Sequence, residues 1–225
     1  MKIRAIITGA TGMIGKGVLL ECLDHPDVEQ VLAVSRRPLD IQHPRLSNVI
    51  HNNFMDLSAI RDQLTGYNAC FFCLGVSATG MSEGDYDQVT RQLTLNFAEN
   101  VLIQNPDITF CYISGAGTDS SEGGRMMWAR VKGKTENQLL AMPFKKAYMF
   151  RPAFIQPMKG IRSSTKLYNV IYDMMKPFYP IIKKFPKYST TTVKLGNAMI
   201  NAASMGYEKS ILESAEINIL SGKGS

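Results

Sequence analysis

The sequence predicts an α/β fold in which a doubly wound parallel sheet is covered by helices on both faces. Segments of strand length alternate with segments of helix length along the first 151 residues. The strand-like segments are continuously apolar, as in Ala69–Leu74, which is typical of strands buried on both faces of a parallel sheet. Right-handed crossovers between such strands give the spatial order 3-2-1-4-5-6.

Hydrophobic periodicity and turn residues place the individual elements. Strands are expected at Lys2–Thr8, Val31–Ser35, Asn48–His51, Ala69–Leu74, Ile108–Ser114 and Ala147–Arg151. Helices are expected at Gly12–Leu23, Ser58–Leu64, Asp85–Gln104 and Met126–Ala141. The longest of these helices carries Val89, Leu93, Phe97 and Val101 at helical spacing, so their side chains are predicted to form one buried stripe.

The pattern changes after Pro152, where prolines punctuate the chain between two helix-like segments. These segments are Lys166–Met175 and Thr192–Ser204, and Glu216–Leu220 is expected as a last edge strand. A chain of 225 residues has the size of one α/β domain with modest additions. We therefore expect a single domain over residues 1–225, with a small, mainly helical cap at residues 153–215.

Composition narrows the class of protein. Hydrophobic residues make up 45% of the chain and charged residues 20%, which is the balance of a folded globular protein rather than a disordered one. The apolar runs have the length of strands, so none is expected to span a bilayer, and the first residues lack the apolar stretch of a signal peptide. We expect a cytoplasmic protein.

The four cysteines are too few for a disulfide-rich scaffold. Cys70 and Cys73 form a C-x-x-C pair, but they lie inside a predicted strand, where these two side chains point to opposite faces. No second pair of ligands accompanies them. We therefore expect both thiols to pack in the core, and we expect no metal site.

Charge is distributed unevenly along the chain. Residues 1–124 hold 8 Lys/Arg and 14 Asp/Glu, a balance of −6, whereas residues 125–225 hold 17 and 5, a balance of +12. Between Lys159 and Lys194 there are eight basic residues and one acid, with aromatic residues between them. We interpret this stretch as a substrate lid with a solvated basic outer face. Contact with an anionic membrane surface and binding of an acidic or phosphorylated substrate are alternatives, whereas nucleic acid binding has no supporting motif.

A glycine-rich turn follows the first predicted strand. Gly9, Gly12 and Gly15 occur at the spacing G-x-x-G-x-x-G, between that strand and the first predicted helix. Glycines there allow a tight turn and a close approach to a pyrophosphate, which the free N–H groups of the helix then bind. The turn residues Thr11, Met13 and Ile14 are expected to contact the same cofactor. A turn that needs glycine for packing alone is the alternative.

The end of the second predicted strand indicates which dinucleotide binds. NAD-preferring sites usually carry an acidic residue there, which holds the ribose 2′-hydroxyl. This chain has Ser35, Arg36 and Arg37 instead, and two guanidinium groups with a hydroxyl suit a 2′-phosphate. We therefore expect NADP(H) rather than NAD(H), although a solvated basic loop would have the same sequence.

Two further strand ends are expected to contribute cofactor contacts. Asp56 and Leu57 follow the third strand, where a carboxylate can reach the adenine amino group, and capping of the next helix by Asp56 is an equal alternative. Leu74 and Gly75 end the fourth strand, and the glycine allows the backbone to pass close to a ribose.

The motifs together resemble the short-chain dehydrogenase/reductase superfamily, a group with the Rossmann fold. The resemblance is to its atypical branch, including the Tat-interacting-protein-like and NAD-dependent epimerase-like proteins, and it covers roughly residues 3–157. It rests on the run Gly9–Gly15 and on Ser35-Arg36-Arg37, Cys73-Leu74-Gly75, Ser114-Gly115, Val131-Lys132-Gly133 and Phe150-Arg151-Pro152.

The resemblance implies roles for particular residues. A serine at the end of the fifth strand orients the substrate carbonyl, and the lysine of a Tyr-x-x-x-Lys motif binds the nicotinamide ribose and lowers the pKa of the tyrosine. Ser114 and Lys132 match these two residues, but Trp128 stands in place of the tyrosine. The backbone from Pro152 through Ala153 and Phe154 is implied to lie near the nicotinamide ring.

The tryptophan leaves two functions open, because an indole N–H cannot deliver a proton as a tyrosine does. The first is an NADP(H)-dependent oxidoreductase or epimerase on a small carbonyl or sugar-like substrate, with the proton supplied by Tyr86, Tyr112, Tyr168 or water. The second is a non-catalytic regulator that senses the dinucleotide and binds a partner protein.

Overall fold

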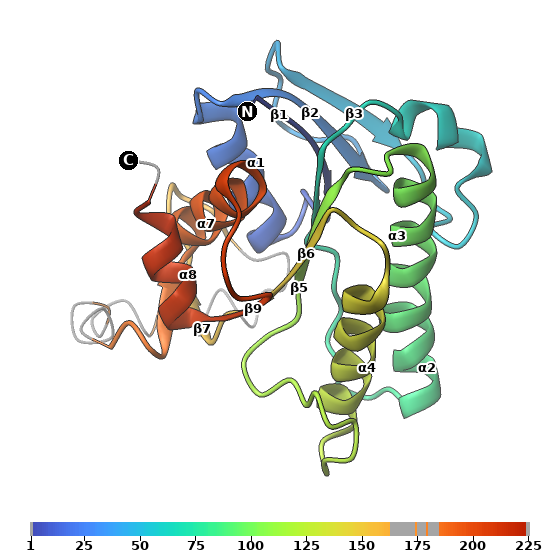
Figure 1. Cartoon of the computed structure of the whole chain (residues 1–225), viewed down its shortest axis with the longest axis vertical. Helices are drawn as coiled ribbons and strands as arrows, with labels where there is room; N and C mark the ends of the chain where they lie inside the picture. Colours follow the sequence, from blue (N-terminus) through green and yellow to red (C-terminus); the bar gives the residue numbers. More distant parts are fainter. Residues whose placement is uncertain (1, 163–173, 175–178, 180–184, 224–225) are drawn as a thin grey trace.

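The computed structural model describes residues 2–162, 174, 179 and 185–223. Its centre is a parallel sheet with the strand order β3-β2-β1-β4-β5-β6-β9 (Figure 1). The strands are β1 (Ile3–Thr8), β2 (Val28–Ser35), β3 (Leu46–Ile50), β4 (Ala69–Phe72), β5 (Thr109–Ile113), β6 (Lys146–Arg151) and β9 (Ile211–Glu213). The predicted fold class and the order 3-2-1-4-5-6 are confirmed, and β9 adds a seventh strand at the edge.

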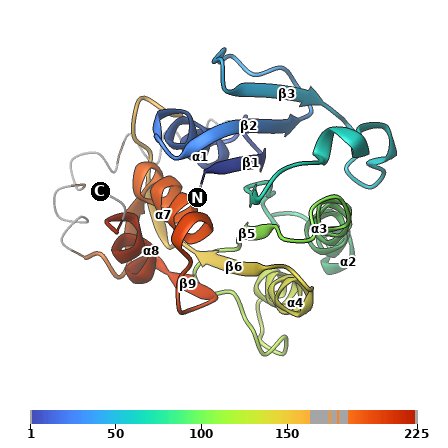
Figure 2. The ribbon, with the colours of Figure 1, turned by 45° about the horizontal axis from the view of Figure 1, so that its top comes forward.

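Helices cover both faces of the sheet (Figure 2). One face carries α1 (Met13–Asp24), α7 (Thr192–Met205) and α8 (Ser214–Ser221). The other carries the 3₁₀ helix η1 (Ser58–Leu64), α2 (Glu83–Asp87), the π turn η2 (Gln88–Gln92), α3 (Leu93–Gln104) and α4 (Met127–Ala141). Each face therefore has its own apolar core, with the sheet between them.

Strand β4 lies between these two cores, and all four of its residues are fully buried. On one side the ring of Phe72 packs against Phe97 and Phe110, at centroid distances of 5.5 and 6.0 Å. Cys70 belongs to that same core, whereas Cys73 packs against the core of the opposite face. The two thiols of the C-x-x-C pair thus point to opposite faces, as strand geometry predicted.

The long predicted helix has a shifted buried face. Val89 is exposed, and Thr90 is buried in its place, together with Tyr86 on the preceding turn. The cause is the π turn η2, which lies between α2 and α3 and contains an extra residue. This residue rotates the buried face of α3 about the helix axis relative to that of α2. The prediction that Val89 shares a buried stripe with Phe97 is therefore wrong.

The predicted edge strand at Glu216–Leu220 is also wrong, because this segment is part of helix α8. Ile217 and Leu220 are fully buried and lie three residues apart, which is helical spacing, whereas Ile219 is 58% exposed. The edge of the sheet is occupied by β9, which is only three residues long. Short strands of this kind carry too few residues for a recognisable alternation.

The C-terminal region contributes to the layers around the sheet. Helix α7 corresponds to the predicted Thr192–Ser204 and packs directly on α1. Two short strands, β7 (Phe154–Gln156) and β8 (Ser189–Thr191), form a separate parallel pair that the sequence did not predict. The predicted helix at 166–175 lies outside the described residues, apart from residue 174.

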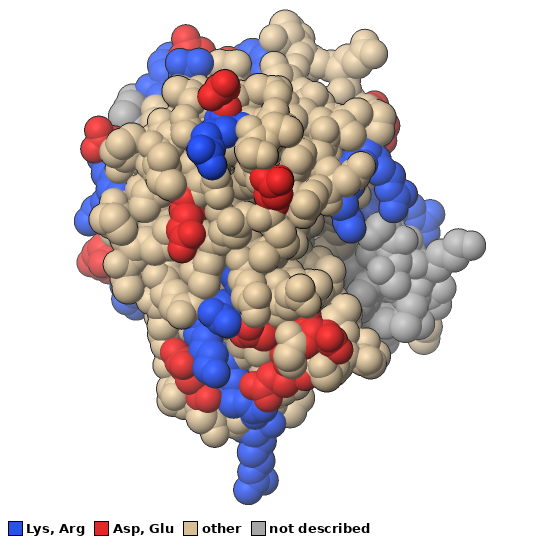
Figure 3. Space-filling view, turned by 90° about the vertical axis from the view of Figure 1, so that its right-hand side faces the viewer, with Lys and Arg blue, Asp and Glu red and all other residues tan. Residues whose placement is uncertain are grey.

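No helix in the described part of the chain is long and apolar enough to cross a membrane. Figure 3 shows the face on which α2, α3 and α4 lie, where acidic and basic groups stand side by side. Arg91 pairs with Asp87 at 2.5 Å, and Arg130 pairs with Glu83 at 2.5 Å. These two ion pairs bring opposite charges together on this face.

Half of the basic residues between Lys159 and Lys194 lie outside the described residues. Lys159 itself pairs with Glu21 at 2.6 Å and with Asp24 at 2.7 Å, both on α1. It is therefore part of a local ion-pair cluster. The lid, membrane-surface and acidic-substrate interpretations of the whole segment stay predictions.

Close packing between α4 and the loop that follows β5 gives a first testable prediction. A Cβ atom on Gly133 would overlap the backbone carbonyl oxygen of Asp119. We expect Gly133→Ala to lower the free energy of unfolding by about 2 kcal/mol, because the backbone cannot give way as a side chain can.

Urea unfolding measures this loss, and Gly123→Ala is the matched control. A Cβ atom on Gly123 would have its nearest neighbour at 3.9 Å, so this substitution should change stability by less than about 0.5 kcal/mol. Equal stability of the two variants would show that α4 does not approach the loop so closely.

Candidate functional site

A cleft lies at the carboxyl ends of β1, β4 and β5, where the strand order reverses between β1 and β4. In open parallel sheets this switch point is where ligands bind. The cleft has two adjoining lobes of about 410 and 680 Å³, which share Gly12, Arg36, Cys73, Leu74 and Gly75. Both volumes lie in the range of small-molecule sites.

The predicted glycine turn forms the floor of the cleft. Gly9 has φ +69°, and a Cβ atom there would lie 2.6 Å from the carbonyl oxygen of Cys73 at the end of β4. A Cβ atom on Gly15 would overlap the carbonyl oxygen of Gly9. Both glycines are therefore required for the turn and the start of α1 to pack against β4.

The first turn of α1 is open toward this cleft. Gly12 is the N-cap residue and provides no side-chain cap, and the first turn contains no acidic residue. Its N–H groups and the positive end of the helix dipole can therefore bind an anion. Thr11 lines the smaller lobe, and Met13 and Ile14 line the larger one. These features fit the pyrophosphate of a dinucleotide.

The smaller lobe contains four charged side chains: Lys16, Arg36, Arg37 and Asp40. Lys16 and Asp40 form an ion pair at 2.7 Å, and the hydrogen bond from Lys16 holds the pKa of Asp40 below its usual value. The sequence did not suggest either residue, since they lie 24 positions apart and outside the motif. A carboxylate is thus present in this lobe, but it is neutralised by a lysine.

Ser35 does not line the cleft, although it was predicted to contact the cofactor. Its hydroxyl group is buried, donates to the carbonyl oxygen of Arg37 at 2.6 Å and accepts from Asn48 at 2.8 Å. The serine therefore fixes the turn that carries the two arginines.

Asp56 and Leu57 also lie outside the cleft. Leu57 is buried in the core beneath η1, so its side chain faces away from the cofactor region. Asp56 accepts a hydrogen bond from the backbone N–H of Ser58 at 3.0 Å, and this bond lowers the pKa of the Asp56 carboxyl group. This bond holds the first residue of η1, which is compatible with the capping interpretation, and the adenine contact stays a prediction.

The larger lobe brings together the remaining predicted residues. Leu74 and Gly75 line both lobes. The larger lobe is also lined by Ser114, Lys132, Pro152, Ala153 and Phe154. These residues come from the ends of β4, β5 and β6 and from α4, so segments far apart in the sequence form one wall.

A buried ion pair lies behind Ser114. The hydroxyl group of Ser114 donates to Glu136, which has no exposed surface. The same hydroxyl oxygen lies 3.2 Å from the carbonyl oxygen of Phe150. Arg151 donates from Nε to both oxygens of Glu136, at 3.0 and 3.1 Å, and this bonding raises the pKa of Arg151. Glu136 was not predicted from the sequence, where the available signal was its position one turn after Lys132 on the same helix.

Lys132 extends from α4 into the cleft. Its ammonium group donates to the backbone carbonyl oxygen of Ser114. Removal from water lowers the pKa of Lys132 to about 8, although the nearby carboxylate of Glu136 acts in the opposite direction. The cleft therefore contains an amine whose pKa is lower than that of an exposed lysine.

The three tyrosines proposed as replacements differ in position. Tyr86 and Trp128 line an adjoining hollow of about 320 Å³ together with Lys132. Tyr112 lies inside β5 with its ring 6.1 Å from that of Phe72, and burial raises its pKa. Tyr168 lies outside the described residues. Of the two described tyrosines, only Tyr86 approaches the site.

The thiols and other possible metal ligands suggest no further chemistry here. Burial raises the pKa of both Cys70 and Cys73, which keeps them as thiols. Among the described residues, no group of three or more His, Cys, Asp or Glu side chains is arranged to hold a metal ion.

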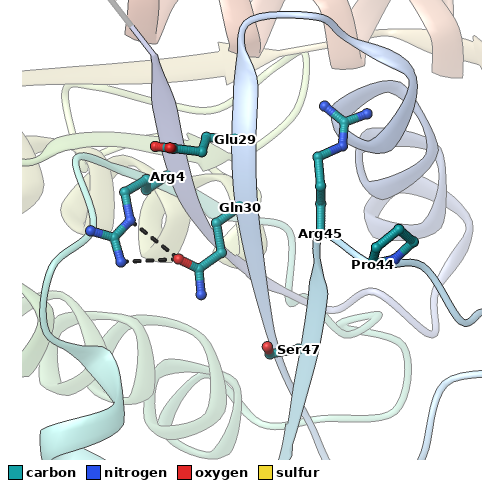
Figure 4. Close-up of a pocket in the computed structure, with 6 residues that line it drawn as sticks. All are labelled: Arg4, Glu29, Gln30, Pro44, Arg45 and Ser47. Carbon is teal, nitrogen blue, oxygen red and sulfur yellow. Dashed lines mark hydrogen bonds between the residues drawn. The ribbon is translucent and has the colours of Figure 1, made fainter.

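A second hollow lies at the opposite, amino end of the strands (Figure 4). Arg4 donates to Gln30 at 3.0 and 3.2 Å, and its guanidinium group lies 5.7 Å from the centre of the Tyr67 ring. Arg45 points away from Arg4 and donates to the carbonyl oxygen of His25 at 2.9 Å, at the end of α1. Both arginines are thus occupied by structural contacts, and the carboxyl-end cleft is the better candidate site.

No model of a known protein family matches the chain. Among individual proteins, it is 26% identical over 212 residues to the mitochondrial protein FMP52 of Debaryomyces hansenii, covering 89% of this chain and 87% of that protein. It is 26% identical over 151 residues to the protein HTATIP2 of Rattus norvegicus, covering 66% of this chain and 61% of that one.

Solved structures share the fold. A short-chain dehydrogenase/reductase family oxidoreductase from Burkholderia thailandensis superposes with a TM-score of 0.70 at 15% identity, covering 96% of this chain and 94% of that one. An NADPH-bound carbonyl reductase from chicken fatty liver superposes with a TM-score of 0.63 at 15% identity, covering 95% and 97%. These structures confirm the Rossmann-type fold that the motifs predicted.

The comparison with individual proteins contradicts the expected cytoplasmic location. FMP52 proteins from several organisms match the chain, and those proteins are named mitochondrial rather than cytoplasmic. Composition and hydropathy do not distinguish these two compartments, so the expectation had no support from particular residues.

The buried ion pair beside the cleft gives a second prediction. We expect Arg151→Leu to lower the free energy of unfolding by about 3–5 kcal/mol, because it leaves the carboxylate of Glu136 buried without its cation. Replacing both residues with leucine should restore much of the loss, since no charge then stays buried.

Denaturant unfolding of the two variants tests this expectation, with Arg130→Leu as the control. The pair of Arg130 with Glu83 is partly exposed, so its loss should cost less than about 1 kcal/mol. A similar small loss for Arg151→Leu would contradict the buried pairing.

Proposed function

We propose that this chain, an atypical member of the short-chain dehydrogenase/reductase superfamily, is an NADP(H)-dependent oxidoreductase or epimerase that acts on a small carbonyl or sugar-like compound. The main support is the continuous cleft that runs from Arg36 past the open N-terminus of α1 to Lys132. The order of these three groups along the cleft matches the order of the 2′-phosphate, the pyrophosphate and the nicotinamide ribose in such a dinucleotide.

The preference for NADP(H) is based on the smaller lobe. Arg36 and Arg37 can both bind a 2′-phosphate, and Asp40 is paired with Lys16 and therefore repels a phosphate less. Solved structures with the same fold contain NADPH in one case and NAD⁺ in another, so the preference is argued from these side chains and not from the fold.

Within the cleft, each group has a physical task. The N–H groups of the first turn of α1 would bind the pyrophosphate, and the ammonium group of Lys132 would bind the nicotinamide ribose. The backbone from Pro152 to Phe154 would lie beside the nicotinamide ring. When bound, the cofactor would supply or accept a hydride.

The alternative is a regulator that binds the dinucleotide without turnover and changes its affinity for a partner protein. Two observations favour it: Trp128 replaces the tyrosine of the family motif, and the hydroxyl of Ser114 is donated to Glu136. This alternative predicts tight cofactor binding with no reaction on any carbonyl compound.

A fluorescence titration followed by a turnover assay separates these functions. The titration is possible because Trp128 is the only tryptophan in the chain and lines the hollow beside Lys132. Bound NADPH or NADH should accept excitation energy from this indole, so binding can be followed by the loss of tryptophan emission. Competition with NADP⁺ and NAD⁺ gives the remaining affinities, and a panel of carbonyl compounds follows with the same sample. Binding with turnover supports the enzyme, and binding without turnover supports the regulator.

The role of Arg36 gives a third prediction. We expect Arg36→Ala to weaken NADPH binding about 10- to 100-fold and to leave NADH binding nearly unchanged, because a charge-assisted hydrogen bond to the 2′-phosphate is worth about 1.5–3 kcal/mol. The energy-transfer titration measures both affinities. Arg61→Ala, on the exposed part of η1, is the control, and an unchanged NADPH affinity in Arg36→Ala would contradict the proposed 2′-phosphate contact.

The pair of Lys16 with Asp40 gives a fourth prediction. We expect Asp40→Asn to tighten NADPH binding about 2- to 5-fold. In the parent protein Lys16 must give up its ion pair with Asp40 in order to bind the phosphate, and that pair is worth up to about 1 kcal/mol. In Asp40→Asn this cost is absent. In a Lys16→Met background the same substitution should have a smaller effect. Equal effects in both backgrounds, measured by calorimetry, would show that Asp40 does not act through Lys16.

A further inference from the structure

The side chains that line the larger lobe offer few proton donors. Its ionisable residues among those described are Arg36, Cys73 and Lys132. Arg36 also lines the smaller lobe, and an arginine stays protonated in proteins. Burial raises the pKa of Cys73, so its thiol is a poor proton donor at neutral pH. Lys132 is the remaining group.

Ser114 is committed to another partner. Its one hydroxyl proton is directed to Glu136, and the carboxylate of Glu136 is held in place by Arg151. The hydroxyl can accept a further hydrogen bond, but it cannot donate one to a substrate oxygen in this arrangement. Ser114 therefore does not supply the proton.

The aromatic residues beside the lobe are also unsuited. Trp128 has an indole N–H that does not ionise in this range. Tyr86 is only 2% exposed, lines the adjoining hollow rather than the larger lobe, and has its pKa raised by burial. Neither replaces the tyrosine of the family motif.

We propose that Lys132 is the proton donor of this site, in place of the missing tyrosine. Its side chain lines the larger lobe, where the nicotinamide is proposed to bind, and it also reaches the adjoining hollow. Its ammonium group has three N–H bonds, of which one is used by the carbonyl oxygen of Ser114. Two remain for the ribose and for a substrate oxygen.

This inference rests on the proposed oxidoreductase function, with NADPH as the reductant. The carbonyl carbon gains a hydride, so the substrate is reduced and NADPH is oxidised to NADP⁺. The carbonyl π electrons move to oxygen, an N–H bond of Lys132 breaks, and a new O–H bond forms. The resulting neutral amine takes a proton from water before the next turnover.

Titration of Lys132 determines the pH dependence. The groups around it are Glu136 on its own helix, Tyr86 on α2 and Cys73 at the end of β4. Desolvation lowers the pKa of Lys132 to about 8, and a general acid is most effective when its pKa lies near the working pH. Since the ammonium form is the donor, carbonyl reduction should be fastest below pH 8 and fall above it. Alcohol oxidation needs the amine and should show the opposite slope.

A fifth prediction concerns Lys132 without any turnover. In protein labelled with ¹³C at the lysine Cε positions, we expect one NMR signal to titrate between about pH 7 and 9, and this signal should be absent from Lys132→Arg. Lys134→Ala, on the same helix, is the control and should retain it. A Lys132 signal that titrates above pH 10 would overturn the proposal, because the ammonium would then hold its proton too tightly.

Chemical rescue then separates proton donation from a structural role. At saturating NADPH we expect Lys132→Ala to lose about 10²- to 10⁴-fold in kcat for carbonyl reduction, and added ethylamine should restore part of it. Tyr86→Phe should retain its kcat. If Lys132→Ala retains kcat, the proton comes from elsewhere and the proposal fails, while the oxidoreductase function stands. If the parent protein reduces no carbonyl compound, the oxidoreductase function itself fails.

Discussion

Gly9 and Gly15 allow the first turn of α1 to pack against the end of β4, and the rest of the cleft depends on this close backbone contact. A Cβ atom at Gly9 would meet the carbonyl oxygen of Cys73, and one at Gly15 would overlap that of Gly9. Because the contact is made by backbone, it leaves the N–H groups of α1 facing the cleft rather than a side chain. Arg36 lies on one side of this turn and Lys132 on the other, so both lobes are organised around it.

A second constraint acts on the chemistry of the larger lobe. Glu136 is a fully buried acid, and it is stabilised there because Arg151 and Ser114 both donate hydrogen bonds to it. This arrangement uses the one hydroxyl proton of Ser114. Trp128 stands where the family motif has a tyrosine. On both grounds we propose Lys132 as the proton donor, and its contact with the carbonyl oxygen of Ser114 links it to the same network.

Much of the fold followed from local patterns, whereas several site residues did not. The glycine spacing predicted the turn, and the continuously apolar strands with right-handed crossovers predicted the strand order. The family resemblance implied the place of Lys132. Asp40 and Glu136 were missed because their roles depend on partners 24 and 15 positions away in the sequence. Ser35, Asp56 and Leu57 lie near the expected strand ends, but their side chains turn into local hydrogen bonds or the core. The π turn shifted the face of the long helix in a way that helical periodicity cannot show.

Binding of NADPH to Gly12→Val distinguishes a dinucleotide site at this turn from a turn that needs glycine for packing alone. A Cβ atom on Gly12 would lie 3.3 Å from the backbone carbonyl oxygen of Gly9, a tight contact that a small shift relieves, so we expect the fold to be retained with a small loss of stability. The same side chain would occupy the space before the first turn of α1, where the pyrophosphate is proposed to bind. Calorimetry should therefore show NADPH binding by the parent and none by Gly12→Val, at a similar Tm. Equal binding by both proteins, or no binding by the parent, would contradict the assignment of this cleft.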